Sequence, residues 1–241
     1  MRKQTITLNP AEPLVVGSFG GLNALQQARS TLITGGFDLI EIRLDILKSD
    51  GWNPSEKPWS AVSCKPLLFT TRCRAEGGAL DLTASQRQEL LTLVIDEAAL
   101  IDVELASCGE MSESLDAMRD HDIPWVASYH RFDEMPDLET LRAKRDLAHA
   151  SGAAVFKVAA MMHSPADIET MLLFQQESSP VLLSTMGMGL LAPESRVRCA
   201  RAGSVLNYGF LGDAPTAPGQ WAAPMLYAAI HDGLITSRPC D

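Results

Sequence analysis

Eight short apolar runs, separated by segments with helical periodicity, constrain the fold of this chain more than any other feature. The predicted strands are residues 14–19, 38–44, 67–71, 100–105, 125–128, 154–158, 181–185 and 204–208. The predicted helices are residues 22–32, 85–98, 112–121, 138–150, 165–177, 193–202 and 220–232. No long polar linker divides the 241 residues. Eight strands alternating with about eight helices indicate a single (β/α)8 or TIM barrel domain over residues 1–241.

An open, doubly wound sheet is the competing fold. Such a sheet normally carries a glycine-rich turn after its first strand, and residues 17–21, Gly-Ser-Phe-Gly-Gly, lack the spacing of a dinucleotide-binding turn. Upstream of the first strand, residues 5–8 followed by Asn9-Pro10 predict a short β-hairpin that closes the bottom of the barrel. Residues 52–63 contain two prolines and are the weakest candidate for a helix.

The composition excludes several classes of partner. The formal net charge is −10 at pH 7, whereas nucleic acid and anionic membranes require clustered lysine and arginine. An anionic substrate would need a few locally placed arginines. The five cysteines are scattered, without a Cys-x-x-Cys pair, which favours reduced thiols over a disulfide framework or a zinc site. Residues 1–7 lack a signal-peptide core and no apolar run reaches transmembrane length, so we expect a cytoplasmic protein.

The sixth predicted strand belongs to an apolar run, residues 154–160, with Lys157 in its middle. Lysine is almost never fully buried unless it is paired or functional, and burial lowers the pKa of an ammonium group. The free amine that results can attack a ketone and form a Schiff base. Taken alone, Lys157 is better explained as a lysine near a strand end that extends to solvent. The residues around it reverse that interpretation.

Charged residues concentrate at the carboxyl ends of the first predicted strands, where (β/α)8 barrels place their catalytic groups. The second strand ends in Glu41, Arg43 and Asp45, which period-two geometry puts on one face, with the intervening apolar residues toward the helices. The third strand runs into Arg72 and a Gly-containing loop, and residues 102–104 carry two acids on one face. Acids beside arginines are equally typical of structural ion pairs that line a barrel.

The later strands add groups of a different kind. The fifth runs into His130, one strand away from Lys157, and histidine can carry protons in both directions near neutral pH. The seventh is followed by Met186 and Met188, which are either core residues or the wall of a site that excludes water. The Pro/Gly-rich loop 212–220 is typical of a lid.

Seven motifs together resemble type I 3-dehydroquinate dehydratase, the Schiff-base enzyme of the shikimate pathway, over nearly the whole chain. They are Glu41-x-Arg43-x-Asp45, Arg72-x-x-x-Glu76-Gly77-Gly78, Ser128-x-His130-x-Phe132, Phe156-Lys157, Met186-x-Met188, Ser195-Arg196 and Ala217-Pro218-Gly219-Gln220. Each is weak alone, but their common order across eight strands makes the resemblance specific.

The resemblance implies a hydro-lyase (EC 4.2.1.10) that converts 3-dehydroquinate into 3-dehydroshikimate through an imine between Lys157 and the C3 ketone. His130 would remove the C2 proton and return it to the departing C1 hydroxyl, and Glu76 would hold His130. Arg196 would bind the substrate carboxylate. The remaining substrate-binding and pocket-lining residues would be Glu41, Arg43, Arg72, Thr216, Gln220, Phe132, Met186, Met188 and Ser18.

The same resemblance implies a small anionic substrate, no metal or other cofactor, and a homodimer in aromatic amino acid biosynthesis. Three positions depart from the family's usual residues. Thr216 replaces a common serine and keeps its hydroxyl, and Tyr208 adds a hydroxyl where phenylalanine is usual. Alignment places Gly17, with Ser18 beside it, where the family often has a substrate-contacting serine.

Two other functions explain part of the pattern. A class I aldolase or transaldolase-like barrel also uses a lysine on its sixth strand, but it does not require His130 or the Pro-Gly-Gln loop. A barrel retained as a non-catalytic binding module would be expected to have lost a catalytic group, whereas Lys157, His130 and Arg196 are all present. Conversion of 3-dehydroquinate into its conjugated product would distinguish these functions from the dehydratase.

Overall fold

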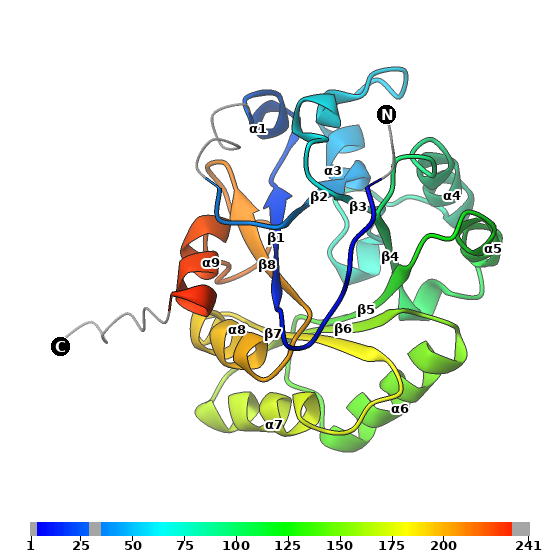
Figure 1. Ribbon diagram of the computed structural model, residues 1–241. Helices are drawn as coiled ribbons and strands as arrows, with labels where there is room; N and C mark the ends of the chain where they lie inside the picture. The colour runs from blue at the N-terminus through cyan, green and yellow to red at the C-terminus, as the bar shows by residue number, and fades with distance from the viewer. Residues whose placement is uncertain (1–3, 29–34, 233–241) are drawn as a thin grey trace.

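A ring of eight parallel strands forms the centre of the computed structural model, which describes residues 4–28 and 35–232 (Figure 1). The strands are β1 (Leu14–Phe19), β2 (Leu39–Arg43), β3 (Leu67–Thr70), β4 (Leu100–Glu104), β5 (Trp125–Arg131), β6 (Val155–Met161), β7 (Leu182–Met188) and β8 (Leu206–Leu211). They pair in the order β7-β6-β5-β4-β3-β2-β1-β8. The predicted (β/α)8 barrel is confirmed.

The closure between β7 and β8 differs from the other strand pairings of the barrel. Strands β7 and β8 are joined by individual bonds instead of a continuous ladder: Val205 N–H donates to Leu183 O at 2.9 Å, and Ser184 Oγ donates to Leu206 O at 2.6 Å. These bonds satisfy polar groups that an open edge would leave exposed. The junction therefore brings β8 beside β7 and completes the ring.

The helices surround the barrel in Figure 1. They are α1 (Leu22–Gln26), α3 (Leu44–Ser49), α4 (Ala84–Thr92), α5 (Ser112–Asp120), α6 (Leu138–Ala150), α7 (Pro165–Gln175), α8 (Ala192–Arg201) and α9 (Ala223–His231), with short 3-10 turns η1 (Pro58–Val62), η2 (Arg74–Glu76) and η3 (Leu105–Ser107). The end of the predicted helix 22–32 lies partly outside the described residues. Among the described residues, no helix is long and apolar enough to cross a bilayer.

Alternate residues of each strand point to the barrel axis, and their character changes along the strands. Near the amino ends they are apolar and buried: Val16, Leu39, Leu68, Leu100, Val126, Val155 and Leu206. Two residues further along they are polar and still buried: Ser18, Glu41, Thr70, Asp102, Ser128 and Lys157. Residues between them, such as Ile40 and Ile42, join the larger core under the helices. The strands thus place a polar layer above an apolar floor.

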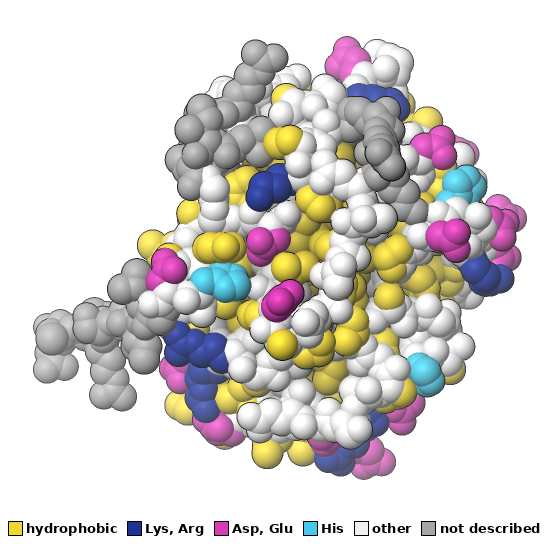
Figure 2. Space-filling view, viewed as in Figure 1, with side chains coloured by type: hydrophobic (Ala, Val, Ile, Leu, Met, Phe, Trp, Pro, Cys, Tyr) yellow, Lys and Arg dark blue, Asp and Glu magenta, His cyan; other side chains and the backbone are white. Residues whose placement is uncertain are grey.

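The amino-terminal segment does not form the predicted hairpin. Its only bridge in the described residues is a single antiparallel pair between Asn9 and Glu12, because Pro10 and the following Pro13 lack the amide donors that a ladder needs. The segment still crosses the opening of the barrel in Figure 1, and Ile6 packs against the apolar floor. Figure 2 shows this face, where hydrophobic side chains lie among backbone and uncharged polar atoms and a few acidic, basic and histidine side chains. The bottom is therefore covered without a hairpin.

Several element boundaries differ from the prediction. Strands β5 to β8 end at residues 131, 161, 188 and 211 instead of 128, 158, 185 and 208. In β5 the additional residues include the polar His130 and Arg131, which continue the parallel ladder with β6, as His130 does opposite Ala159. His130 therefore lies inside its strand. The additional residues of β6 to β8 are apolar or glycine. Conversely, Leu44 and Asp45 begin helix α3 and do not extend β2. Residues 52–63, the weakest candidate for a helix, contain only the 3-10 turn η1.

Candidate active site

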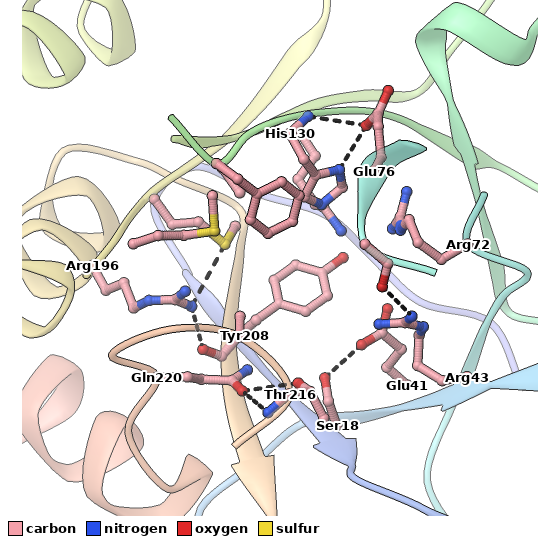
Figure 3. Close-up of a pocket in the computed structure, with 17 residues that line it drawn as sticks. Ser18, Glu41, Arg43, Arg72, Glu76, His130, Arg196, Tyr208, Thr216 and Gln220 are labelled. Carbon is pink, nitrogen blue, oxygen red and sulfur yellow. Dashed lines mark hydrogen bonds and ion pairs between the residues drawn. The ribbon is translucent and has the colours of Figure 1, made fainter. Parts of the chain in front are cut away.

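A cavity opens at the carboxyl ends of the strands (Figure 3). It has a volume of about 590 Å³, including space open to solvent. Every residue that the sequence assigned to the site lines it: Lys157, His130, Glu76, Glu41, Arg43, Arg72, Arg196, Thr216, Gln220, Phe132, Met186, Met188 and Ser18. Gly77, Ala159, Tyr208 and Ala217 complete the lining.

Lys157 lies deep in this cavity and is 4% exposed. Its Nζ donates a hydrogen bond to Asp102 Oδ2 at 2.7 Å and lies 4.3 Å from the ring centroid of Tyr208. Burial lowers the pKa of the ammonium below its usual 10.5, and Arg72 adds to this, although Asp102 opposes it. The amine is therefore easier to deprotonate than an ordinary lysine, as nucleophilic attack requires.

Asp102 contacts the amine directly, although sequence analysis did not assign it to the site. It accepts from Ser128 Oγ at 2.6 Å and pairs with Arg72 Nη2 at 2.9 Å, besides its bond to Lys157. Burial by itself raises the pKa of Asp102, but Arg72 and Lys157 hold that pKa at about 2. Its inward position two residues after Leu100 was the available signal in the sequence. Glu104 shares that face, however, so the sequence did not show which of the two acids contacts Lys157.

From Asp102 a line of alternating charges runs outward through the barrel wall. Arg72 Nη1 pairs with Glu104 Oε1 at 2.9 Å, and Glu104 Oε2 pairs with Arg87 Nη1 of helix α4 at 2.8 Å. Arg87 in turn bonds to Glu110, a partly exposed carboxylate. Although burial opposes it, the carboxylates of Asp102 and Glu104 raise the pKa of Arg72 above its usual value. Every buried charge in this line therefore has a partner of opposite sign.

His130 is held by Glu76, which lies in η2 above the third strand. Glu76 Oε2 lies 2.8 Å from His130 Nδ1 and accepts the His130 backbone N–H at 3.0 Å. Burial, together with Arg72 and Lys157, keeps the pKa of His130 well below 6.5. Burial also raises the pKa of Glu76 to about 7, against the opposing effect of Arg72. With Nδ1–H donated to the carboxylate, the neutral imidazole presents Nε2 as a proton acceptor.

Phe132 lines the cavity near His130. The two rings are stacked, with centroids 6.3 Å apart and planes 15° apart. Gly77 allows this arrangement, because a Cβ at that position would lie 2.8 Å from Phe132 Cζ and its φ of 89° is left-handed. The Gly77 of the motif thus fits a close approach of the aromatic ring.

Arg196 faces the cavity from helix α8 and is 1% exposed. Its Nη1 donates to Tyr208 O at 2.6 Å and contacts Met186 Sδ at 3.6 Å, whereas its Nε has no partner in the described part of the chain. No carboxylate among the described residues pairs with it, and burial lowers its pKa to about 10. A buried guanidinium without a counter-ion is suited to an anionic ligand.

The residue before Arg196 explains its orientation. Ser195 Oγ accepts the Gly187 backbone N–H at 3.0 Å and donates to Ala192 O at 2.9 Å. A Cβ on Gly187 would come within 2.4 Å of this hydroxyl. Helix α8 therefore packs closely on β7, and the next residue points inward.

Glu41 occupies the opposite side of the cavity, on β2. Its Oε2 accepts from Ser18 Oγ at 2.6 Å and its Oε1 from Thr70 Oγ1 at 2.8 Å. Ser18, and not Gly17, therefore faces the cavity. Gly17 points outward, where a Cβ would meet Leu211 at 2.5 Å.

Arg43 and Asp45 were expected on one strand face, but only Arg43 lines the cavity. Arg43 makes a two-point ion pair with Asp45, with distances of 2.8 and 2.6 Å. Asp45 also accepts the backbone N–H groups of Ala79 at 3.0 Å and Arg72 at 3.3 Å. From the first turn of α3, it therefore holds the loop that carries Glu76.

The loop after β8 supplies the last two residues of the site. The backbone N–H and Oγ1 of Thr216 both donate to Gln220 Oε1, each at 2.8 Å. These bonds close the loop on itself at the cavity wall. Among the described residues, no group of three His, Cys, Asp or Glu side chains is placed to hold a metal ion.

Comparison with known proteins identifies the family. Residues 20–232 match the model of the family described as type I 3-dehydroquinase. This chain belongs to the type I 3-dehydroquinase family. The resemblance inferred from the seven motifs is therefore confirmed.

Relatives in this family cover most of the chain. It is 31% identical over 209 residues to a 3-dehydroquinate dehydratase of Methanocella arvoryzae, covering 86% of this chain and 91% of that protein. It is 32% identical over 191 residues to a bifunctional 3-dehydroquinate dehydratase/shikimate dehydrogenase of Arabidopsis thaliana, covering 77% of this chain but only 31% of that protein. A 3-dehydroquinate dehydratase structure from Geobacillus kaustophilus has a TM-score of 0.83 at 25% identity, covering 98% of both chains.

Proposed function

We propose that this chain dehydrates 3-dehydroquinate to 3-dehydroshikimate through an imine on Lys157. Membership of the type I 3-dehydroquinase family supports the reaction. The observation that carries the residue assignment is a buried amine with a lowered pKa in the same cavity as a buried, unpaired guanidinium, Arg196. The substrate has a ketone for the first group and a carboxylate for the second.

The reaction begins at Lys157. Its neutral amine attacks the C3 carbonyl carbon, and the resulting carbinolamine loses water to give a protonated imine. Asp102, 2.7 Å from Nζ, stabilises this cation as it stabilises the ammonium. The protonated imine withdraws electrons from C3 and so acidifies the hydrogens on C2.

His130 moves the protons. Its Nε2 takes the C2 proton, and the electron pair of that bond moves to the imine nitrogen to form an enamine. The enamine then returns its electrons and breaks the C1–O bond, while His130 gives the proton to the departing oxygen, which leaves as water. Hydrolysis of the new imine releases 3-dehydroshikimate and the free amine. Glu76 serves throughout by holding Nδ1.

The rest of the cavity orients the substrate. Arg196 binds its carboxylate with two parallel N–H donors. The ring hydroxyls and the flanks of the ring contact the residues around them: Ser18, Glu41, Arg43, Arg72, Phe132, Met186, Met188, Thr216 and Gln220. The apolar members of this group exclude water, which strengthens the charge interactions.

We further propose that the protein acts as a cytoplasmic homodimer without a metal or organic cofactor and binds no nucleic acid. The dimer rests on the family resemblance, and the net charge of −10 supports the absence of nucleic acid. Light scattering coupled to size-exclusion chromatography should give twice the chain mass of 26.1 kDa. A monomer at micromolar concentration would contradict the dimer.

Borohydride trapping tests the site, the chemistry and the substrate together. Sodium borohydride added during turnover of 3-dehydroquinate should reduce the imine and add ligand mass to the peptide that contains Lys157. Lys157→Met should abolish both turnover and labelling, because methionine fills a similar volume without a nucleophile. Lys144→Met, a matched change on helix α6 outside the cavity, should leave both intact. A label on another peptide, or turnover by Lys157→Met, would refute the assignment.

A further inference from the structure

The hydroxyl of Tyr208 is buried in the cavity wall without a hydrogen-bond partner among the described residues. Tyr208 is 4% exposed and lines the same cavity as Lys157. A buried polar group without a partner costs roughly 1–3 kcal/mol, and most such groups in folded proteins are satisfied. A phenylalanine would fill this position without that cost. The unpartnered hydroxyl therefore points to a ligand that completes it.

The ring of Tyr208 lies between the two groups that define the substrate's orientation. Lys157 Nζ lies 4.3 Å from the ring centroid, and Arg196 donates to the Tyr208 backbone oxygen at 2.6 Å. In Figure 3, Arg196 lies at one end of the ring, and the hydroxyl points to the opposite side, where Glu41 and Arg72 lie. The hydroxyl thus points away from Arg196, which we propose binds the substrate carboxylate.

The carboxylates on that side are already occupied. Both Glu41 oxygens accept hydroxyl donors, from Ser18 and Thr70. Asp102 accepts from Lys157, Ser128 and Arg72. Burial raises the pKa of Tyr208 well above 10, and the charges of Asp102 and Glu41 raise it further. The hydroxyl thus remains protonated and is available as a donor.

We propose that Tyr208 is a further substrate-binding residue whose hydroxyl donates a hydrogen bond to the C4 oxygen of the ring. The inference rests on the proposed function, since it takes the carboxylate at Arg196 and C3 at Lys157. In that orientation C2 lies on the side of Arg196, between C1 and C3. C4 lies beyond C3, on the side to which the hydroxyl points, and it carries a hydroxyl in 3-dehydroquinate.

The test is a cycle that removes the oxygen from each partner in turn. Tyr208→Phe removes one hydroxyl, and 4-deoxy-3-dehydroquinate removes the other. For 3-dehydroquinate, Tyr208→Phe should lower kcat/KM by about 3- to 10-fold, the value of one neutral hydrogen bond. For the 4-deoxy compound, wild type and variant should have the same kcat/KM, because the bond is already absent. The control Tyr227→Phe, on α9 outside the cavity, should change neither.

The melting temperature separates this role from a structural one. Tyr208→Phe should melt at or above the wild-type temperature without ligand, because it removes a buried hydroxyl without a partner. An equal loss for both substrates, no loss for either, or a lower melting temperature as the sole change would overturn the inference. A wild-type protein that does not turn over 3-dehydroquinate would instead overturn the proposed function on which it rests.

Discussion

The two sides of the cavity treat buried charge in opposite ways. On the side of strands β2 to β5, Arg72 is 3% exposed and pairs with Asp102 and Glu104. On the side of β7, β8 and α8, Arg196 is equally buried but pairs with no described carboxylate. Their pKa values shift accordingly, upward for Arg72 because of its carboxylates and down to about 10 for Arg196 because of burial.

This difference separates the part of the site that is complete without ligand from the part that is not. The paired side fixes Lys157 and His130 before the substrate arrives, which is the condition for an aligned reaction. The other side leaves Arg196 without a counter-ion among the described residues, so binding energy is gained there when a ligand supplies one. Changes on the two sides should therefore affect different measurements.

The largest effect is expected for His130, the proposed acid–base residue on the paired side. His130→Ala should lower kcat by roughly 10²- to 10⁴-fold, the range for loss of an acid–base group, with a much smaller change in KM. His149→Ala, an exposed histidine on α6, is the matched control and should be silent. Steady-state kinetics with 3-dehydroquinate decides the matter. A near-normal kcat for His130→Ala would remove its role in proton transfer.

The two arginines test the comparison itself. Arg72→Met should lower the free energy of unfolding by about 3–5 kcal/mol, because it breaks a buried ion-pair network. Arg196→Met should change that free energy by less than about 1 kcal/mol, since it removes an unpaired buried charge at the cost of one hydrogen bond. Urea denaturation without ligand measures both. Similar losses in the two variants would show that the sides do not differ.

Substrate binding should depend strongly on Arg196. Arg196→Met should raise KM by roughly 10²-fold, because the substrate carboxylate loses its buried partner. Arg196→Lys keeps the charge without the planar pair of donors and should recover part of the loss. An unchanged KM in Arg196→Met would place the carboxylate elsewhere in the cavity.

A smaller effect is expected from pH. As pH falls through about 7, Glu76 takes up a proton and becomes a donor to His130 Nδ1. The ring proton then moves to Nε2, which can no longer accept the C2 proton. The pKa of His130 itself is well below 6.5, so the ring stays neutral over this range. kcat/KM should therefore be level above pH 8 and fall about tenfold between pH 8 and 6.

Glu76→Gln provides the control for this pH dependence. Glutamine cannot titrate, so the fall near pH 7 should disappear, although the maximum rate should be lower because the amide holds the imidazole less firmly. A wild-type profile that stays level down to pH 5 would show that the protonation of Glu76 does not control the reaction.

The barrel and most of the cavity could be predicted from the sequence because their signals are local. Apolar runs located all eight strands, and the period of two placed Glu41 and Arg43 inward. The site motifs lie at the carboxyl ends of the strands, and in a parallel barrel all of these ends lie at the same end of the barrel. Residues of separate motifs, such as Lys157 and Arg196, therefore line one cavity, as the sequence predicted.

What could not be predicted depends on pairing between strands. The ladder opposite β6 carries β5 through His130 to Arg131, although polar residues end a strand in a local interpretation. Asp102 and Glu104 were equivalent in the sequence, and only the packing of the barrel interior gives Lys157 to Asp102 and Arg87 to Glu104. The partner of each buried charge is determined by tertiary packing, and it cannot be predicted from the order of residues alone.

The line of alternating charges from Lys157 to Glu110 has a consequence for how this protein can evolve. Arg87 lies on an outer helix, yet a neutral residue there would leave Glu104 with one partner fewer and so disturb the setting of the amine. Substitutions of these charged residues should therefore be tolerated only as compensating pairs. Positions far from the substrate should covary with one another, and the order in which such changes accumulate should matter.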